Sequence, residues 1–247
     1  MSLLQKRNMK SKLIIFDFDG TIADTSPGIL DSHKFALARM GRIVPEESEL
    51  LKVIGGQLLK TYIDVFKFDE QSAVEAVRIY RERYANVGIN LANLYDGFED
   101  LIIQLKNYGC NIGIATLKAE RFAKEMLKKF NMLDKFDVVC GMDKCDSQTK
   151  TDLIEKCIEF CNVNKSQAIL VGDSSNDLKG AEAAGIRFIG VTYGFGFKKN
   201  VEYNFITADS PREVYSAVQK INNKQKEDIY ENGSVCSNQN EQRETSW

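Results

Sequence analysis

The feature that most constrains the fold of this chain is a series of short apolar runs separated by segments with helical spacing. The first run is Lys12–Asp17 (KLIIFD), and the later ones are Asn111–Thr116, Phe136–Cys140, Ala168–Gly172, Arg187–Val191 and Asn204–Ile206. Runs of this kind are typical of strands buried on both faces. Because helical patterns lie between most of them, the sequence predicts an α/β fold whose parallel sheet carries helices on both faces.

One long segment breaks this alternation of strands and helices. Residues 24–94 carry helical patterns and no convincing strand. A crossover between parallel strands needs only about a dozen residues, so the segment predicts an inserted helical subdomain. We therefore expect a core formed by residues 1–23 and 95–221, with the insertion at 24–94. Residues 222–247 are polar, with few large apolar side chains, and predict a disordered tail.

Composition excludes several classes of function. Lys and Arg number 33 against 35 Asp and Glu, and this balance disfavours binding to nucleic acid through phosphates. No apolar run approaches the ~18 residues of a membrane span, and the first ten residues do not resemble a secretory signal. The six cysteines form no CxxC pair and the chain has a single histidine, which disfavours a zinc site. We expect a cytoplasmic protein that acts on a small molecule; its oligomeric state stays open.

Two aspartates follow the first predicted strand, in Asp17-Phe18-Asp19-Gly20-Thr21. Residues two apart on a strand point to the same side, so both carboxylates can face one site. They lie at the carboxyl end of the strand, where open α/β sheets bind ligands. Carboxylates this close repel each other, so the pair requires a cation or a shared proton. The alternative is a strand end that carries two solvated acids.

A second acidic cluster follows the strand at Ala168–Gly172, in Asp173-Ser174-Ser175-Asn176-Asp177. Asp173 and Asp177 can reach the same pocket as the first pair if the two strands are neighbours. Several carboxylates without His or Cys form a set of oxygen ligands that suits Mg²⁺. Such Asp, Asn and Ser runs are also common in ordinary turns, which is the alternative.

Thr116 and Lys150 are candidate phosphate ligands. Thr116 ends its predicted strand, so its hydroxyl and the next backbone N–H, of Leu117, could hold a phosphate oxygen where a helix begins. The alternative for Thr116 is a helix cap without a ligand. Lys150 stands at the start of the predicted helix Thr151–Cys161, where the helix dipole does not favour a cation. Its charge therefore indicates a role elsewhere, unless it is simply a solvated lysine.

Taken together, these residues resemble the haloacid dehalogenase-like superfamily. DFDGT, a threonine at the second strand's end, a lysine before a helix, and VGDSSND match its four motifs in order over most of the chain. The helical insertion resembles the small cap of that superfamily, whose core is Rossmann-like. LYDGFEDLIIQLKNYG and GVTYGFG resemble the phosphoglycolate phosphatases and the related 5′-nucleotidase-like group. The family's lysine usually precedes proline, whereas Lys150 precedes Thr151, and Lys144 is the alternative lysine.

The resemblance implies a Mg²⁺-dependent phosphatase that hydrolyses a small phosphate monoester, either phosphoglycolate-like or nucleotide-like. Asp17 would attack phosphorus to form an aspartyl-phosphate. Asp19 would protonate the leaving oxygen and then activate water. The implied site residues are Asp17, Asp19 and Asp173 for the metal, Thr116 and Lys150 for the phosphoryl group, and Asp177 for orienting the metal's surroundings.

Two other functions stay open at this point. A sugar phosphomutase on the same scaffold would keep both Asp17 and Asp19 but return the phosphoryl group to a bound sugar. A receiver-like α/β module phosphorylated on an aspartate is disfavoured by the cap, because a simple receiver has no lid to exclude water. A dehalogenase is disfavoured because that branch lacks the second aspartate of the DFDGT motif. The substrate is left open among phosphoglycolate, nucleoside monophosphates, pyrophosphate and sugar phosphates.

Overall fold

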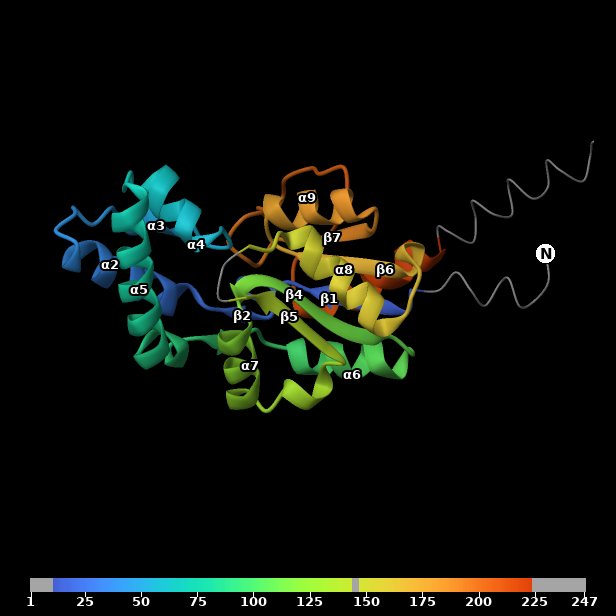
Figure 1. The fold of residues 1–247 in the computed structure, drawn as a ribbon. Coiled ribbons are helices and arrows are strands. Elements are labelled where there is room, and N and C mark those ends of the chain that lie inside the picture. The colour runs from blue at the N-terminus through green and yellow to red at the C-terminus, as the bar shows by residue number, and fades with distance from the viewer. Residues whose placement is uncertain (1–10, 144–146, 224–247) are drawn as a thin grey trace, which may run out of the picture.

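A six-stranded sheet in which neighbouring strands run parallel forms the centre of the computed structural model, which describes residues 11–143 and 147–223 (Figure 1). The strand order is β5-β4-β1-β6-β7-β8. The bounds are Leu13–Phe16 for β1, Asn111–Ala119 for β4, Val138–Met142 for β5, Ala168–Gly172 for β6, Arg187–Val191 for β7 and Ile206–Ala208 for β8. The predicted α/β fold with a parallel sheet is confirmed.

Helices cover both faces of the sheet. In Figure 1, α6 (Phe98–Asn107) and α7 (Glu120–Lys129) lie on one side, and α8 (Lys150–Cys161) and α9 (Ser175–Ala184) lie on the other. Alternate residues of β1 point to opposite faces: Ile14 and Phe16 belong to one apolar core, Leu13 and Ile15 to the other. A strand between two cores needs apolar residues at every position, which explains the uninterrupted run in the sequence. Short 3₁₀ turns occur at Leu133–Lys135 and Lys165–Gln167.

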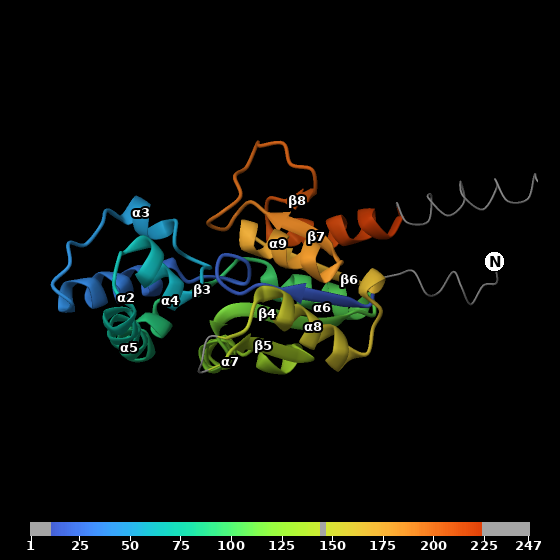
Figure 2. The same cartoon turned by 45° about the horizontal axis from the view of Figure 1, so that its top comes forward.

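The inserted segment forms a group of helices beyond the carboxyl ends of the strands (Figures 1 and 2). Its elements are α2 (Ser26–Arg39), α3 (Glu47–Leu51), α4 (Leu58–Lys60), a π-helical turn (Thr61–Val65), α5 (Glu70–Asn86) and a 3₁₀ turn (Gly88–Asn90). The chain leaves and re-enters the core through two short antiparallel strands, β2 (Ala23–Asp24) and β3 (Asn93–Leu94). This pair was not predicted, because two residues are too few to show a strand periodicity.

Two predicted strands are displaced by two residues. β5 begins at Val138 rather than Phe136, because the chain before it forms the 3₁₀ turn Leu133–Lys135. β8 begins at Ile206 rather than Asn204. Lys144 and residues 224–247, which include most of the predicted tail, lie outside the described residues. Within the residues that are described, no helix is both long and apolar enough to cross a membrane.

The last described helix, residues 211–223, packs against the start of the chain. Asn222 is buried, and its side-chain Oδ1 accepts hydrogen bonds from the Ser11 backbone N–H at 3.0 Å and from the Ser11 hydroxyl at 2.8 Å. Asn222, which the sequence assigned to the tail, is thus part of the packed helix.

We expect Asn222→Ala to destabilise the fold by about 1–3 kcal/mol, because two buried donors of Ser11 lose their acceptor. Urea unfolding measures this change. Asn223→Ala is the control, since Asn223 is exposed on the same helix and its loss should cost less than about 0.5 kcal/mol. Equal effects of the two substitutions would contradict the assigned role of Asn222.

Candidate active site

The loop after β1 brings two buried aspartates to the carboxyl end of the sheet. The Asp17 backbone N–H still donates to the Val171 carbonyl at 2.9 Å, so Asp17 continues the line of the strand. The chain then turns at Gly20, whose φ of +79° is strained for other residues. A Cβ at Gly20 would also collide with the Asp173 carboxylate. The turn therefore needs glycine both for its conformation and for the close approach of Asp173.

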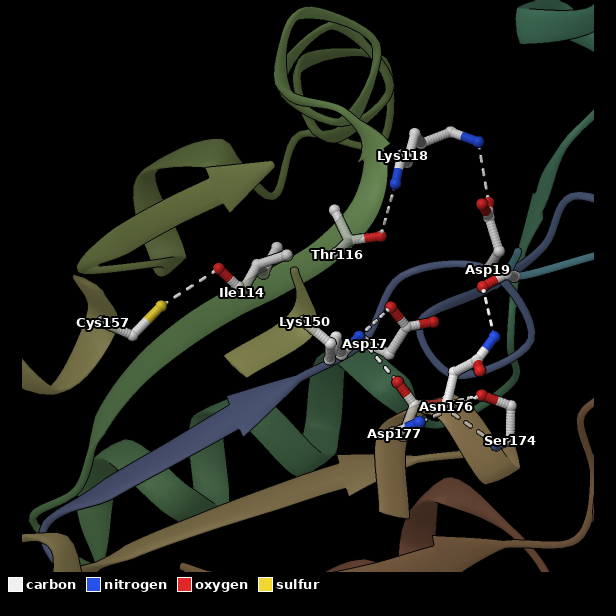
Figure 3. Close-up of polar contacts among 11 residues, drawn as sticks. Asp17, Asp19, Ile114, Thr116, Lys118, Lys150, Cys157, Ser174, Asn176 and Asp177 are labelled. Atoms are coloured by element: carbon white, nitrogen blue, oxygen red, sulfur yellow. Dashed lines mark hydrogen bonds and ion pairs between the residues drawn. The ribbon is translucent and has the colours of Figure 1, made fainter. Parts of the chain in front are cut away.

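Lys150 joins Asp17 to Asp177 (Figure 3). Its Nζ lies 2.5 Å from Asp17 Oδ1 and 2.6 Å from Asp177 Oδ1, and all three side chains are under a tenth exposed. Lys150 is the first residue of α8, after a capping box formed by Thr149 and Asp152. The lysine stem crosses Gly180 of α9, where a Cβ would come within 2.6 Å of Lys150 Cγ. The lysine is thus directed into the site, which explains a cation at an unfavourable helix end.

Asp173 and Asp177 follow β6, the strand next to β1. Ser174 caps α9, and Asp177 Oδ2 accepts from the Ser174 backbone N–H at 3.0 Å and from its hydroxyl at 2.6 Å. With Lys150 on its other oxygen, Asp177 has both oxygens engaged. Asp173 Oδ2 accepts from the Phe195 backbone N–H at 2.6 Å. Carboxylate oxygens of Asp17, Asp173 and Asp177 lie within 4.8 Å of one another.

The charge balance of this cluster fits a divalent cation. Burial, opposed by Lys150 and assisted by Asp177 and Asp19, raises the pKa of Asp17 to about 7. Burial and the neighbouring Asp177 and Asp17 raise the pKa of Asp173 to about 8. When all four buried aspartates are ionised, they face two buried lysines, Lys118 and Lys150, which leaves an excess of two negative charges. Oxygen donors with this excess match what a hard divalent ion such as Mg²⁺ requires.

Thr116 is buried beside this cluster, but its local structure differs from the prediction. We expected the strand to end at Thr116 and a helix to begin directly after it. Instead β4 runs on to Ala119, with an irregular register between Thr116 and Ala119, and α7 begins at Glu120. The Leu117 N–H is therefore not at a helix start. Thr116 Oγ1 accepts from the Lys118 backbone N–H at 3.2 Å, and Thr116 lines the same cavity as Asp17 and Asp19.

Lys118 is a site residue that the sequence analysis missed. Its Nζ lies 2.8 Å from Asp19 Oδ1, and its side chain is 5% exposed. In Figure 3 this pair stands apart from the group formed by Lys150, Asp17 and Asp177. The only signal for Lys118 was a lysine two positions after Thr116, and it gained importance only because the strand extends beyond its predicted end.

A cavity of about 80 Å³ lies between the sheet edge and the inserted helices. Its walls include Asp17, Asp19, Thr116 and Lys118 from the core, and His33, Gly55, Tyr80 and Tyr84 from the insertion. The insertion also hydrogen-bonds to the first turn of α9 and to the loop before α8, next to the charged cluster. Asn176 Nδ2 donates to the Gly55 carbonyl, and Gln57 Nε2 donates to the Gln148 carbonyl, both at 3.2 Å. The helices therefore act as a cap that closes over the aspartates.

A parallel α/β core with an acidic cluster at its carboxyl edge and a helical cap defines a class of hydrolases. Residues 14–191 match the model of the haloacid dehalogenase-like hydrolase family, and the chain belongs to that family. The chain is 36% identical over 184 residues to a 5′-nucleotidase of Pseudomonas aeruginosa, an alignment that covers 74% of this chain and 83% of that protein. It is 33% identical to the tyrosine-protein kinase PtkA of Mycobacterium tuberculosis, over 75% of this chain and 63% of that longer protein.

Other comparisons agree with this assignment. Proteins named phosphoglycolate phosphatase and pyrophosphatase are relatives at lower identity. The crystal structure of a predicted phosphatase from Clostridium acetobutylicum superposes with a TM-score of 0.78 at 33% identity, covering 86% of this chain and 98% of that one. The predicted family, its fold with an inserted helical cap and its class of enzyme, a phosphatase, are confirmed.

The raised pKa values predict how metal-free protein responds to pH. Asp17 and Asp173 hold protons in the folded chain at pH values where the unfolded chain, with a pKa of 3.8, has lost them. Folding stability therefore falls as pH rises towards 8. We expect the melting temperature in chelator to fall between about pH 6.5 and pH 8, and added Mg²⁺ to offset the fall.

The pH window avoids a contribution from His33. Burial lowers the pKa of His33 to about 3, so this residue changes stability mainly below its ordinary value of 6.5 and contributes little above about pH 7. Asp173→Asn is the matched variant and should flatten the pH dependence, because it removes one of the two titrating carboxyls. A melting temperature that rises over this window in the absence of metal would contradict the charge balance of the site.

Proposed function

We propose that this chain is a Mg²⁺-dependent phosphatase that hydrolyses a small phosphate monoester through an aspartyl-phosphate on Asp17. The observation that carries the proposal is the buried cluster of Asp17, Lys150, Asp173 and Asp177 at the floor of a capped cavity. The names of the relatives, 5′-nucleotidase and phosphoglycolate phosphatase, support this class of substrate.

In the first step, an Asp17 oxygen attacks phosphorus while the bond from phosphorus to the ester oxygen breaks. Asp17 Oδ1 is engaged by Lys150, which orients the carboxylate and leaves Oδ2 for the attack. Asp19, on the cavity wall beside Lys118, takes a proton from the bound monoprotonated phosphate ester and gives it to the departing oxygen. The products of this step are the free alcohol and phosphorylated Asp17.

In the second step, water attacks the phosphorus of phosphorylated Asp17. Asp19, now a carboxylate, takes a proton from that water, and the bond from phosphorus to the Asp17 oxygen breaks. Inorganic phosphate leaves with the proton that Asp19 had taken, and both aspartates are carboxylates again. The cap contributes by excluding bulk water, which its hydrogen bonds through Gly55 and Gln57 support.

Asp17, Asp173 and the backbone carbonyl of Asp19 would hold the metal, with Asp177 outside them. Asp177 suits this outer role because Lys150 and Ser174 occupy both of its oxygens. When bound, Mg²⁺ would cancel negative charge that otherwise repels a phosphate dianion. Thr116 and Lys150 would contact the phosphoryl oxygens, and the position of each beside Asp17 supports this role.

The size of the cavity favours a small leaving group, and we propose a phosphorylated metabolite rather than nucleic acid as the partner. Cys140, Cys157 and Cys161 are free thiols, which supports a reducing compartment, the cytoplasm. We further propose residues 24–94 as the cap domain.

A sugar phosphomutase is the second candidate function, since Asp19 would serve it equally well. Release of inorganic phosphate from a simple ester distinguishes a phosphatase from a phosphomutase.

Removal of metal should abolish turnover. We expect excess chelator to stop hydrolysis of p-nitrophenyl phosphate, and Mg²⁺ to restore it. Ca²⁺ should substitute poorly, because it prefers more ligands at longer distances. Full activity in excess chelator would rule out the proposed metal site.

Asp17→Asn and Asp19→Asn should fail at different steps. Asp17→Asn lacks the nucleophile and should give neither product nor phosphoenzyme. Asp19→Asn keeps the nucleophile, so p-nitrophenyl phosphate, whose leaving group needs no proton, should still phosphorylate Asp17. Without a base the second step should slow by about 10²–10⁴-fold. Stopped-flow absorbance should then show a burst of p-nitrophenolate near one per enzyme, followed by slow turnover.

The control for this experiment is metal binding by each variant, measured by calorimetry, because a lost metal would also stop turnover. A burst from Asp17→Asn would reject Asp17 as the nucleophile. If both variants bind metal and are equally inactive, the separate roles of the two aspartates are wrong.

A further inference from the structure

We propose that Lys118 is a positioning residue that holds the Asp19 carboxylate at the cavity wall, and that the ring of Tyr84 from the cap holds Lys118 there. The inference rests on the proposed function, in which Asp19 is the acid and base. It adds a residue that none of the motifs contains, and it connects the cap to the chemistry of the core.

The ion pair between Lys118 and Asp19 is buried and separate from the rest of the charged cluster. Lys118 Nζ lies 2.8 Å from Asp19 Oδ1, and the two side chains are 5% and 10% exposed. A buried ammonium group is costly unless it is paired, so this contact fixes both side chains. Figure 3 shows the pair on the opposite side of Asp17 from Asp177. Lys118 thus keeps the Asp19 carboxylate away from Lys150 and from the metal-binding oxygens.

Lys118 reaches this position because β4 continues past Thr116. The strand ends at Ala119 after its irregular register, and this extension carries Lys118 to the wall of the cavity. Had the chain entered a helix directly after Thr116, as the sequence indicated, Lys118 would lie in the first helical turn.

The cap supplies the second contact of Lys118. The Nζ atom lies 4.6 Å from the centroid of the Tyr84 ring, within the range of a cation–π interaction. Tyr84 belongs to α5 of the cap and is 1% exposed. Its ring also meets Phe122 of α7 edge-on at 5.2 Å, and its hydroxyl donates to Met126 Sδ at 3.6 Å.

Tyr84 is therefore wedged between the cap and the core at the point where Lys118 holds Asp19. A cap that moved away would remove the nearer of the two aromatic rings over the ammonium group, leave the Phe18 ring of the core at 5.7 Å, and open the ion pair to water. Placement of the acid and closure of the cap are then a single event, so that Asp19 is in place only when water is excluded. Lys118 keeps its own proton throughout and transfers none.

The test compares Lys118→Met with Lys118→Arg on two esters, in the presence of Mg²⁺. For phosphoglycolate, whose leaving oxygen needs a proton, we expect Lys118→Met to lower kcat by about 10²-fold or more. The burst phase with p-nitrophenyl phosphate, which needs no acid, should slow by less than tenfold. KM should change less than threefold, since Lys118 acts on Asp19 rather than on the substrate. Lys118→Arg should have a kcat at least tenfold higher than that of Lys118→Met, because arginine restores the cation.

Lys124→Met is the matched control, since Lys124 forms an exposed ion pair with Glu120 outside the cavity. It should behave as the wild type on both esters. The ring of Tyr84 is tested by Tyr84→Leu, which should show the same dependence on leaving group as Lys118→Met. Tyr84→Phe keeps the aromatic face and should lose less activity than Tyr84→Leu. If Lys118→Met does not fold, the comparison of Tyr84→Leu with Tyr84→Phe tests the inference instead.

Several results would overturn the inference while leaving the proposed function intact. A raised KM with unchanged kcat would make Lys118 a substrate ligand. An equal loss on both esters would make its role structural, and full activity of Lys118→Met would show that it has none. A wild-type chain that hydrolyses neither ester would instead overturn the proposed function, and this inference with it.

Discussion

The rest of the site depends on the two ion pairs that the buried ammonium group of Lys150 forms with neighbouring carboxylates. Asp17 directly follows β1 and Asp177 lies in the first turn of α9, so Lys150 of α8 ties three elements together. Removing one partner from a buried ion pair typically costs about 3–5 kcal/mol, because the other charge is left uncompensated. Like charges at the edge of the sheet can be assembled only because this cation lies among them.

A second cation gives the two aspartates of the DFDGT motif different environments. Lys150 holds Asp17 towards the acidic cluster, whereas Lys118 holds Asp19 towards the cap. Residues two apart on a strand begin on the same side, so the sequence alone makes the two carboxylates equivalent in position. Their separation comes from which lysine each one meets, and it provides a physical basis for one nucleophile and one acid.

Much of the site could be predicted because parallel strands end at a common edge. Once β1 and β6 are recognised as strands, Asp17, Asp173 and Asp177 must lie near each other, and the structure gathers them within 4.8 Å. Lys150 was predictable from its unfavourable place at a helix start. Lys118 was not, because its importance depends on a strand that runs past Thr116, which no local pattern indicates. Asn222 was likewise missed, since its partner Ser11 lies at the other end of the chain.

In the proposed reaction the phosphoryl group passes through Asp17. The most direct measurement is acid quenching of Asp19→Asn a few seconds after mixing with Mg²⁺ and p-nitrophenyl phosphate, followed by peptide mass spectrometry. We expect the added mass of one phosphoryl group on the peptide that contains Asp17, with fragmentation placing it on that residue. An adduct on any other residue, or product formed with no adduct at any time during turnover, would contradict it.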